Sequence, residues 1–282
     1  MPKRNWLLSV LAIASCWSAA ALPARSQALL PYTPDIDVEL LEQQGLVLAR
    51  DVVQLIRFEQ YDLALPRAKL AAQLAPNSYE AWFILGSLHV QRGDFDKAIS
   101  ILRTAQRLAP NEAGVRFTLG SAYFRKEQYN QALVELEAGL AIDPSSVEAR
   151  FDLGNSYLML ARFPDAIRAY QEALEQNDEF WPAMNNIGLV RYEQGDVQGA
   201  IRDWQAALAI DAEAAEPMLA IAVALYSQGN QEEGLSLATE ALNLDRAYAD
   251  LEYLRINLWG ERLLRDAAQL LAAPQLAALV GS

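Results

Sequence analysis

The residues that could perform acid–base or nucleophilic chemistry are few in this sequence. Histidine occurs once, as His89, and cysteine once, as Cys16. A catalytic triad would therefore depend on His89 alone, and the Cys and His spacing of a zinc site is missing. The paired carboxylates Glu232 and Glu233 fall in an expected turn or exposed face, where such pairs are usually only solvated. We therefore predict a protein that is not an enzyme, with no catalytic residue, no metal site and no cofactor.

The glycines form no phosphate-binding loop either, because they follow a long and regular spacing. Leu-Gly or Ile-Gly returns every 34 residues, and three further strings of small residues and prolines keep the same period. The four strings are Gly86, Gly120, Gly154 and Gly188; Ala64, Ala98, Ala132, Ala166, Ala200 and Gly234; Ala71, Ala105, Gly139, Ala173, Ala207 and Ala241; and Pro76, Pro110 and Pro144. A fixed period of this length over most of a chain is the signature of a helix–turn–helix array.

Each repeat divides into two amphipathic helices. In the second repeat the pattern predicts helices at Tyr79–Gln91 and Phe95–Leu108, separated by a break in which Gly93 can adopt positive φ. Small residues such as Ala98 let the two helices cross closely, and a leucine there would overpack the crossing. His89 occupies a position of the repeat that packs between the helices, so we interpret it as a core residue.

This pattern resembles the tetratricopeptide repeat, which places a large residue, Leu-Gly, aromatic residues, alanines and a proline at fixed offsets. Six units can be counted, at 45–78, 79–112, 113–146, 147–180, 181–214 and 215–248, which together form the array 45–248. The match is strong in the second to fourth units, whereas Asp51-Val52 replaces Leu-Gly in the first and Ala222 replaces glycine in the sixth. The resemblance implies an all-α fold, a right-handed superhelical solenoid of about six helix–turn–helix units with C-terminal capping helices.

Both flanks of the array are predicted to be partly helical. Residues 29–44 form a linker and the start of the first helix, for which Thr33 and Pro34 are a favourable beginning. After Leu244 the repeat fades, and residues 249–282 are predicted to form capping helices that break near Gly260 and end in a short tail. We expect the capping helices to shield the exposed face of the sixth unit.

The N-terminus has the organisation of a secretory signal peptide. Lys3 and Arg4 precede an uncharged apolar run that reaches Leu22, and small residues follow at Ser26 and Ala28. We predict that residues 1–28 are a signal peptide and that the mature protein is exported, to a periplasm or a thylakoid lumen.

Two alternatives keep the chain at a membrane. Ile13-Ala14-Ser15-Cys16 loosely fits a bacterial lipobox, in which case Cys16 would be lipidated and become the first residue. The apolar run could also remain as an uncleaved anchor, although it is shorter than the roughly 20 apolar residues that a spanning helix requires. Apart from these routes we expect no membrane contact.

The charge of the chain excludes one class of partner. Removal of residues 1–28 takes away three basic residues and no acid, so the formal charge falls from −13 to −16. An acidic protein repels phosphate backbones and anionic headgroups. We therefore expect a protein partner, a peptide or helix segment, and no nucleic acid.

In tetratricopeptide proteins the first helix of every unit lines a concave groove, so the resemblance implies a peptide-binding site on these helices. Two rows of residues, seven positions apart, share that face. The candidate groove residues are Phe83, Phe117, Phe124, Phe151, Asn155, Asn185, Asn186, Tyr192 and Tyr226. Aromatic faces bury apolar side chains, and amides pair with peptide N–H and C=O groups. We therefore expect replacement of Asn185 and Asn186 by alanine to weaken binding with little change in melting.

The resemblance does not name the ligand. The family consensus itself favours aromatic residues in both rows, and packing between units is their alternative role. In one subclass, Lys, Arg and Asn at set groove positions hold the C-terminal carboxylate of a chaperone. Those positions here hold Phe83, Ile84, Phe117 and Thr118, with Glu80 and Gly114 where a lysine could help. No C-terminal carboxylate clamp is therefore expected.

The function implied by these features is that of a non-catalytic interaction scaffold or adaptor that holds an extended peptide or helix. Assembly of a membrane complex is a candidate setting for this role. The ending Asn257–Leu264 resembles that of tetratricopeptide proteins from photosynthetic bacteria and plastids, which would make photosystem assembly a candidate. Two alternatives stay open. The protein could be a self-associating structural protein, or an accessory subunit of an envelope polysaccharide machinery.

Overall fold

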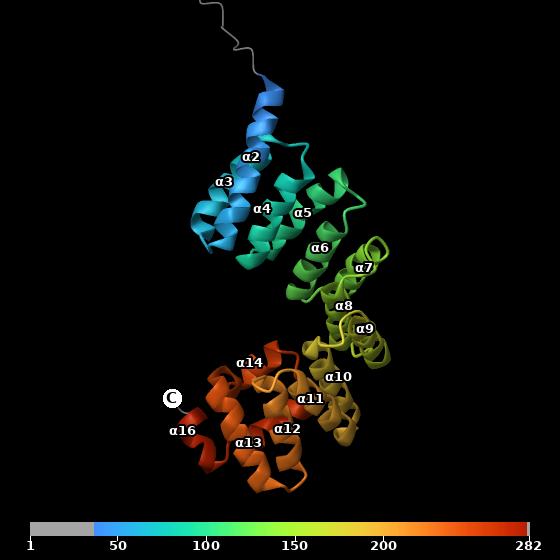
Figure 1. Cartoon of the computed structure of the whole chain (residues 1–282), viewed down its shortest axis with the longest axis vertical. Coiled ribbons are helices and arrows are strands. Elements are labelled where there is room, and N and C mark those ends of the chain that lie inside the picture. Colours follow the sequence, from blue (N-terminus) through green and yellow to red (C-terminus); the bar gives the residue numbers. More distant parts are fainter. Residues whose placement is uncertain (1–36, 281–282) are drawn as a thin grey trace, which may run out of the picture. The chain divides into compact units, whose positions relative to one another are not determined.

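A computed structural model of the protein describes residues 37–280, and this part of the chain contains only helices and their connections, without strands (Figure 1). Contacts group Glu39–Ser282 into one compact unit. The helices are α2 (Val38–Arg57), α3 (Tyr61–Leu74), α4 (Tyr79–Gln91), α5 (Phe95–Leu108), α6 (Ala113–Arg125), α7 (Tyr129–Leu140), α8 (Val147–Met159), α9 (Phe163–Gln176), α10 (Trp181–Gln194), α11 (Val197–Ile210), α12 (Ala215–Ser227), α13 (Gln231–Leu244), η1 (Arg246–Ala249), α14 (Leu251–Ile256), α15 (Glu261–Leu271), η2 (Pro274–Leu276) and α16 (Ala277–Val280).

The helices pack as consecutive pairs, α4 with α5, α6 with α7, α8 with α9, α10 with α11 and α12 with α13, and each pair packs against the next. The predicted all-α solenoid of helix–turn–helix units is therefore confirmed, and the two helices predicted in the second repeat have the observed bounds of α4 and α5. We call the surface formed by the first helices of these pairs, α4, α6, α8, α10 and α12, the inner surface.

Local sequence signals explain where the helices begin and turn. The Ser78 and Ser146 hydroxyls accept hydrogen bonds from the backbone N–H groups of Ala81 and Ala149, which satisfies one free donor at the start of α4 and of α8. At the break between α4 and α5, Gly93 has a φ of 74°, as predicted.

The residues equivalent to Gly93 in the other repeats also adopt positive φ, and several of them are not glycine. Glu59, Glu127 and Ala161 have φ of 58°, 60° and 55°. A residue with a side chain pays a conformational cost in this region. The repeated turn therefore keeps one backbone geometry even where the sequence no longer marks it with glycine.

Small residues at the helix crossings have the packing role that the repeat predicts. Ala98, Ala132, Ala166 and Ala200 are fully buried. A Cβ atom added to Gly120 would lie 2.6 Å from the Cγ of Leu136, so the second helix of the pair approaches where no side chain stands. Stacking of successive pairs joins these crossings into extended hydrophobic cores.

The C-terminal helices contact both the last helix pair and an earlier helix of the array. The break near Gly260 is present, and α16 and η2 contact α13 of the sixth pair. However, α15 packs against both α10 and α12, which are first helices. The C-terminal helices therefore cover the sixth unit, and α15 also extends over α10, which the sequence pattern did not indicate.

The predictions for residues 1–28 and for a helix start at Thr33 and Pro34 lie outside the described residues. The described part of the first helix, α2, begins at Val38. None of the helices in residues 37–280 has both the length and the apolar character needed to cross a bilayer.

Candidate functional site

The inner surface consists of two regions that differ in exposure. On α4, α6 and α8 the aromatic side chains of Phe83, Phe117, Phe124 and Phe151 are half-buried, and we call this part the open region. On α10 and α12, which α15 contacts, most of the inward-facing side chains are buried in one core with α15, and we call this part the covered region. Its buried residues are Leu189, Tyr192, Leu219 and Val223.

Side chains of the open region pack against their own helix pair or the connection that follows it, and they stay half-buried. A Cβ on Gly139 would lie 2.5 Å from the nearest ring atom of Phe117, so that ring packs closely on the backbone of α7. The ring of Phe151 contacts Tyr170 and makes an edge-to-face contact with Phe180, with centroids 5.3 Å apart. These contacts hold the rings in place, so the open region is a preformed apolar surface.

In the covered region, polar contacts fix α15 against α10. The Glu193 carboxylate accepts hydrogen bonds from the backbone N–H groups of Arg262 and Leu263, at 3.2 and 3.0 Å, and so caps the start of α15. The Tyr192 hydroxyl donates to Asp266 at 2.7 Å, and the Arg262 guanidinium stacks over the Tyr192 ring.

Two of the predicted groove residues are used by this packing. Tyr192 is fully buried, so its place in an accessible groove is corrected by the structure, since α15 occupies the space that a ligand would need. Tyr226 is half-buried and packs against the same core. The sequence could not show this, because both residues hold the repeat position of Val90 and Phe124, which are only half-buried in earlier units.

The three predicted amides come together, but in the interior. Asn155, Asn185 and Asn186 are 7%, 1% and 5% exposed. The Asn186 amide donates to Asn155 Oδ1 at 2.9 Å, and the Tyr170 hydroxyl donates to the same oxygen at 2.8 Å. The Asn185 amide in turn donates to Asn186 Oδ1 at 3.1 Å. Because these bonds are buried, the structure leads us to expect a lower melting temperature when Asn185 and Asn186 are replaced, rather than the small change predicted from the sequence.

A cavity of about 220 Å³ lies where the two regions meet, and we call it the junction pocket. Its lining combines aromatic and aliphatic side chains with a polar floor, and one wall comes from the loop after α14. The lining residues are Phe124, Phe151, Asn155, Trp181, Pro182, Asn185, Asn186, Glu216, Ile256, Asn257 and Leu258. Three separate segments, α6–α8, α10–α12 and the loop after α14, thus converge on one small site.

The polar floor contains a carboxyl with an unusual environment. The indole N–H of Trp259 donates to Glu216 Oε1 at 2.9 Å. Burial raises the pKa of Glu216 to about 7, and hydrogen bonds from Trp259 and Asn185 act in the opposite direction. The Asn185 Oδ1 atom is buried and has no hydrogen-bond partner among the described residues.

Sequence reasoning missed Glu216, Trp181 and the wall that contains Leu258. For Glu216 a signal existed: it occupies the same repeat position as Glu80, which lies where the chaperone-binding subclass could use a lysine. The wall carried no such signal, because Leu258 lies beyond the repeats and reaches the pocket only through the fold of the C-terminal helices.

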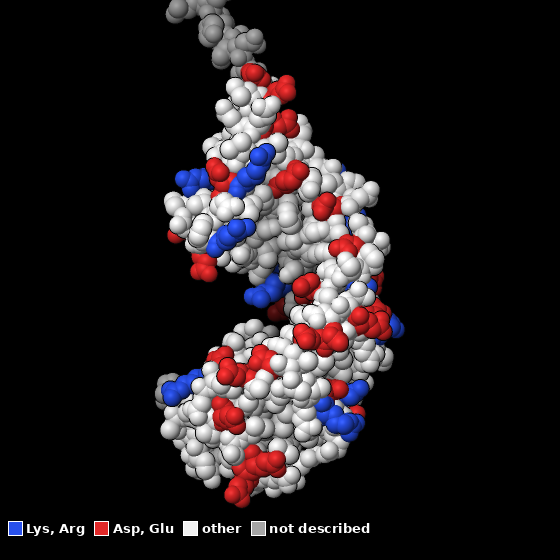
Figure 2. All heavy atoms as spheres, viewed as in Figure 1, with Lys and Arg blue, Asp and Glu red and all other residues white. Residues whose placement is uncertain are grey.

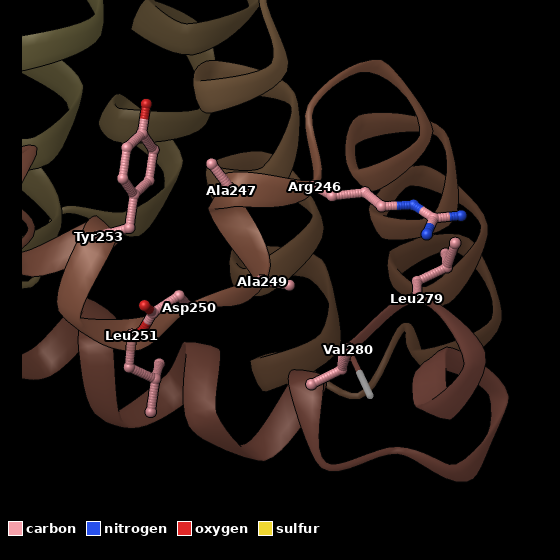
Figure 3. Close-up of a pocket in the computed structure, with 8 residues that line it drawn as sticks. All are labelled: Arg246, Ala247, Ala249, Asp250, Leu251, Tyr253, Leu279 and Val280. Carbon is pink, nitrogen blue, oxygen red and sulfur yellow. The ribbon is translucent and has the colours of Figure 1, made fainter. Parts of the chain in front are cut away.

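Other parts of the described structure are weaker candidates for a functional site. His89 is buried and its Nδ1 lies 3.1 Å from Asp94 Oδ2, which confirms its place in the core. A pocket between η1, α14 and α16 is lined by Arg246, Asp250 and Tyr253 together with apolar residues, and its Arg246 and Tyr253 side chains do not converge on one point (Figure 3). Residues 37–280 contain no cluster of His, Cys, Asp or Glu suited to a metal ion. Acidic side chains are spread over the visible face rather than gathered in one patch (Figure 2).

Comparison with known families agrees with this architecture. The family described as "Tetratricopeptide repeat" matches residues 151–216 and 185–252, and "TPR repeat" matches 120–160. "Anaphase-promoting complex, cyclosome, subunit 3" matches 59–139. A search of curated proteins found no significant match.

Solved structures with the same fold are tetratricopeptide proteins. A crystal structure of MamA is 26% identical, with a TM-score of 0.52, and covers 58% of this chain and 96% of its own. YrrB, described as a TPR protein with an unusual peptide-binding site, is 19% identical with a TM-score of 0.53, over 62% of this chain and 90% of its own. TTC0263, a thermophilic TPR protein from Thermus thermophilus, is 22% identical with a TM-score of 0.52, over 66% and 99%.

The fold and its inner surface define a solenoid of the kind that serves in protein–protein interaction. The chain is a tetratricopeptide-repeat protein.

Proposed function

We propose that this protein is a non-catalytic adaptor that binds an extended peptide or a helix of a partner protein along the open region. The observation that carries the proposal is the row of half-buried aromatic side chains Phe83, Phe117 and Phe151, which recur at one helix position on α4, α6 and α8. An apolar row of this kind on a protein surface favours a partner. A tetratricopeptide neighbour, YrrB, is described as having a peptide-binding site.

The covered region supports the same proposal by contrast. There the protein supplies its own helix, α15, which buries the apolar side chains of α10 and α12. Near α6 and α8, α14 and Leu258 line only the junction pocket and the cavity beside Phe124, and the aromatic row on α4, α6 and α8 stays half-buried. A partner segment would therefore bury on the open region the kind of surface that α15 buries further along the array.

Site-specific photo-crosslinking tests this function. Benzoylphenylalanine placed at Phe117 in the open region should capture a partner protein from the native extract. The matched control carries the same group at Ile210, which is 44% exposed and ends a second helix. Capture of one partner from position 117 and none from position 210 is the expected result. Equal capture at both positions contradicts the proposal, and capture of only a second copy of the chain favours the self-associating alternative.

We further propose that the adaptor acts outside the cytoplasm, in a periplasm or thylakoid lumen, during assembly of a membrane complex. This part of the proposal rests on the basic, apolar and small-residue segments of residues 1–28. The intact mass of the native protein tests it. A mature chain that starts at Leu29 without an adduct agrees with export, and a chain that starts at Cys16 with added acyl mass shows lipidation. A chain that starts at Met1 and is recovered from the cytosol contradicts both.

A further inference from the structure

We propose that the junction pocket binds the cationic end of a basic side chain, lysine or arginine, from the partner segment. The inference rests on the proposed function, because it assigns one anchoring residue to a segment that lies on the inner surface. Three observations carry it: an acceptor-bearing floor, a carboxyl without a positive neighbour, and aromatic walls.

The floor contains one hydrogen-bond acceptor that the protein leaves unused, Asn185 Oδ1. The NH2 group of Asn185 faces two acceptors, Asn186 Oδ1 and the Glu216 carboxyl. Rotation of this amide by 180° would bring oxygen against oxygen, so its orientation is determined by the network. The Oδ1 atom must then face away from both partners, where it is buried without a hydrogen bond. A buried acceptor without a donor is costly, and a ligand N–H group would satisfy it.

The Glu216 carboxyl lacks a counterion. It receives hydrogen bonds from neutral donors only, Trp259 and Asn185. None of the described residues that line the pocket is a lysine or an arginine. The nearest basic residue of the α14 segment, Arg255, lines the neighbouring cavity and pairs with Glu261 at 2.5 Å. A desolvated carboxylate gains most from a positive charge brought within a few ångströms.

The walls suit the rest of a basic side chain. Phe124, Phe151 and Trp181 line the pocket with aromatic surface, which attracts a cation over the ring faces. Ile256 and Leu258 add aliphatic surface against which the methylene stem of a lysine or arginine can pack. A neutral apolar side chain would use these walls but would leave the carboxyl and the Asn185 oxygen unpaired.

The experiment titrates small probes into the full-length protein labelled with ¹⁵N, at pH 8 and constant ionic strength. The probes are n-butylammonium, n-butylguanidinium and neutral n-butanol, and the reporters are the Trp259 indole N–H and the Asn185 side-chain amide. We expect saturable shifts at both reporters with a cationic probe, and an affinity at least tenfold lower for n-butanol. The stronger of the two cations identifies lysine or arginine as the preferred residue.

The variant Glu216→Gln keeps an acceptor for Trp259 and the size of the side chain, but removes the charge. It should reduce the affinity for the cation to that for n-butanol. The matched control is Glu148→Gln, which removes an exposed acid at the same repeat position outside the pocket and should leave the affinity within twofold.

Absence of saturable shifts, equal binding of n-butanol, or unchanged cation binding in Glu216→Gln each overturns the inference. Because these probes need no partner, such a result leaves the photo-crosslinking from Phe117 intact, and the two proposals can fail separately.

Discussion

The open and covered regions of the inner surface have equivalent repeat positions and different surroundings. Phe117 on α6 is half-buried, whereas Leu219, three repeats further on, is fully buried. The C-terminal helices account for the difference, because Leu254, Trp259 and Leu263 join Leu219 in one core and α15 packs on α10 and α12. The repeat therefore determines which residues face inward. A segment outside the repeat determines which of these residues are accessible to a partner.

The largest expected effect separates the two regions directly. Leu263→Ala empties a fully buried site between α15 and the inner surface, and should lower the free energy of unfolding by about 2–5 kcal/mol. Phe83→Ala in the open region should cost about 1 kcal/mol, because its half-buried ring loses less contact. Urea unfolding followed by circular dichroism measures both. Equal losses would show that the two regions are packed alike.

A substitution at a helix crossing tests whether the open region is held by its repeats alone. Ala132→Leu inserts a large side chain where Ala132 is fully buried, and should destabilise by about 1–3 kcal/mol. Hydrogen exchange should show lost protection mainly in α6–α9, because stability in an array depends on neighbouring units. The control Val134→Leu, at a site that is 64% exposed, should change little. Loss spread evenly over the whole chain would contradict the repeat model.

The amide cluster lies at the boundary of the two regions and should behave as core. Asn186→Ala removes the donor to Asn155 and the acceptor for Asn185, and should cost about 1–2 kcal/mol. Asn130→Ala, at an exposed site, is the matched control. Thermal melting compares the two variants. An unchanged melting temperature in Asn186→Ala would show that the Asn186 amide does not contribute to the core and is free to bind a ligand in the groove.

The smallest effect concerns the pH dependence set by Glu216. Burial raises its pKa from the ordinary 4.5 to about 7. Between these values the folded protein holds a proton that the unfolded chain releases, so this contribution to stability is full below pH 4.5 and is lost as the pH rises through 7. Glu216→Gln should therefore gain about 1 kcal/mol relative to the parent at pH 8, and much less at pH 5. Urea unfolding at pH 5 and pH 8 measures the difference. The same gain in stability at both pH values would show that the Glu216 carboxyl does not cause the pH dependence.

Much of the architecture could be predicted because its causes are local. The bounds of α4 and α5 follow from apolar spacing and from the break at Gly93, and the core role of Ala132 follows from its place at a helix crossing. The turns show the limit of such signals. Glu127 and Ala161 adopt the same left-handed conformation as Gly93, although neither residue type predicts this conformation.

The candidate site could be predicted only in part. The repeat correctly brings Asn155, Asn185 and Asn186 together, but their burial depends on contacts between α8, α9 and α10 that no single repeat contains. Tyr192 was placed in the groove for the same reason that Phe124 was, since both hold one position of the repeat. Only the packing of α15 distinguishes them.

The sequence by itself determined the helix–turn–helix period, the small residues at the crossings and the residues that face inward, because these depend on spacing along the chain. The tertiary structure alone decided that α15 folds back over α10 and α12, that Leu258 closes one wall of the junction pocket, and that Glu216 becomes a buried carboxyl there. The physical reason is that an amphipathic helix reveals the face it must bury but not the surface that will bury it, since that choice compares contacts between residues far apart in the chain.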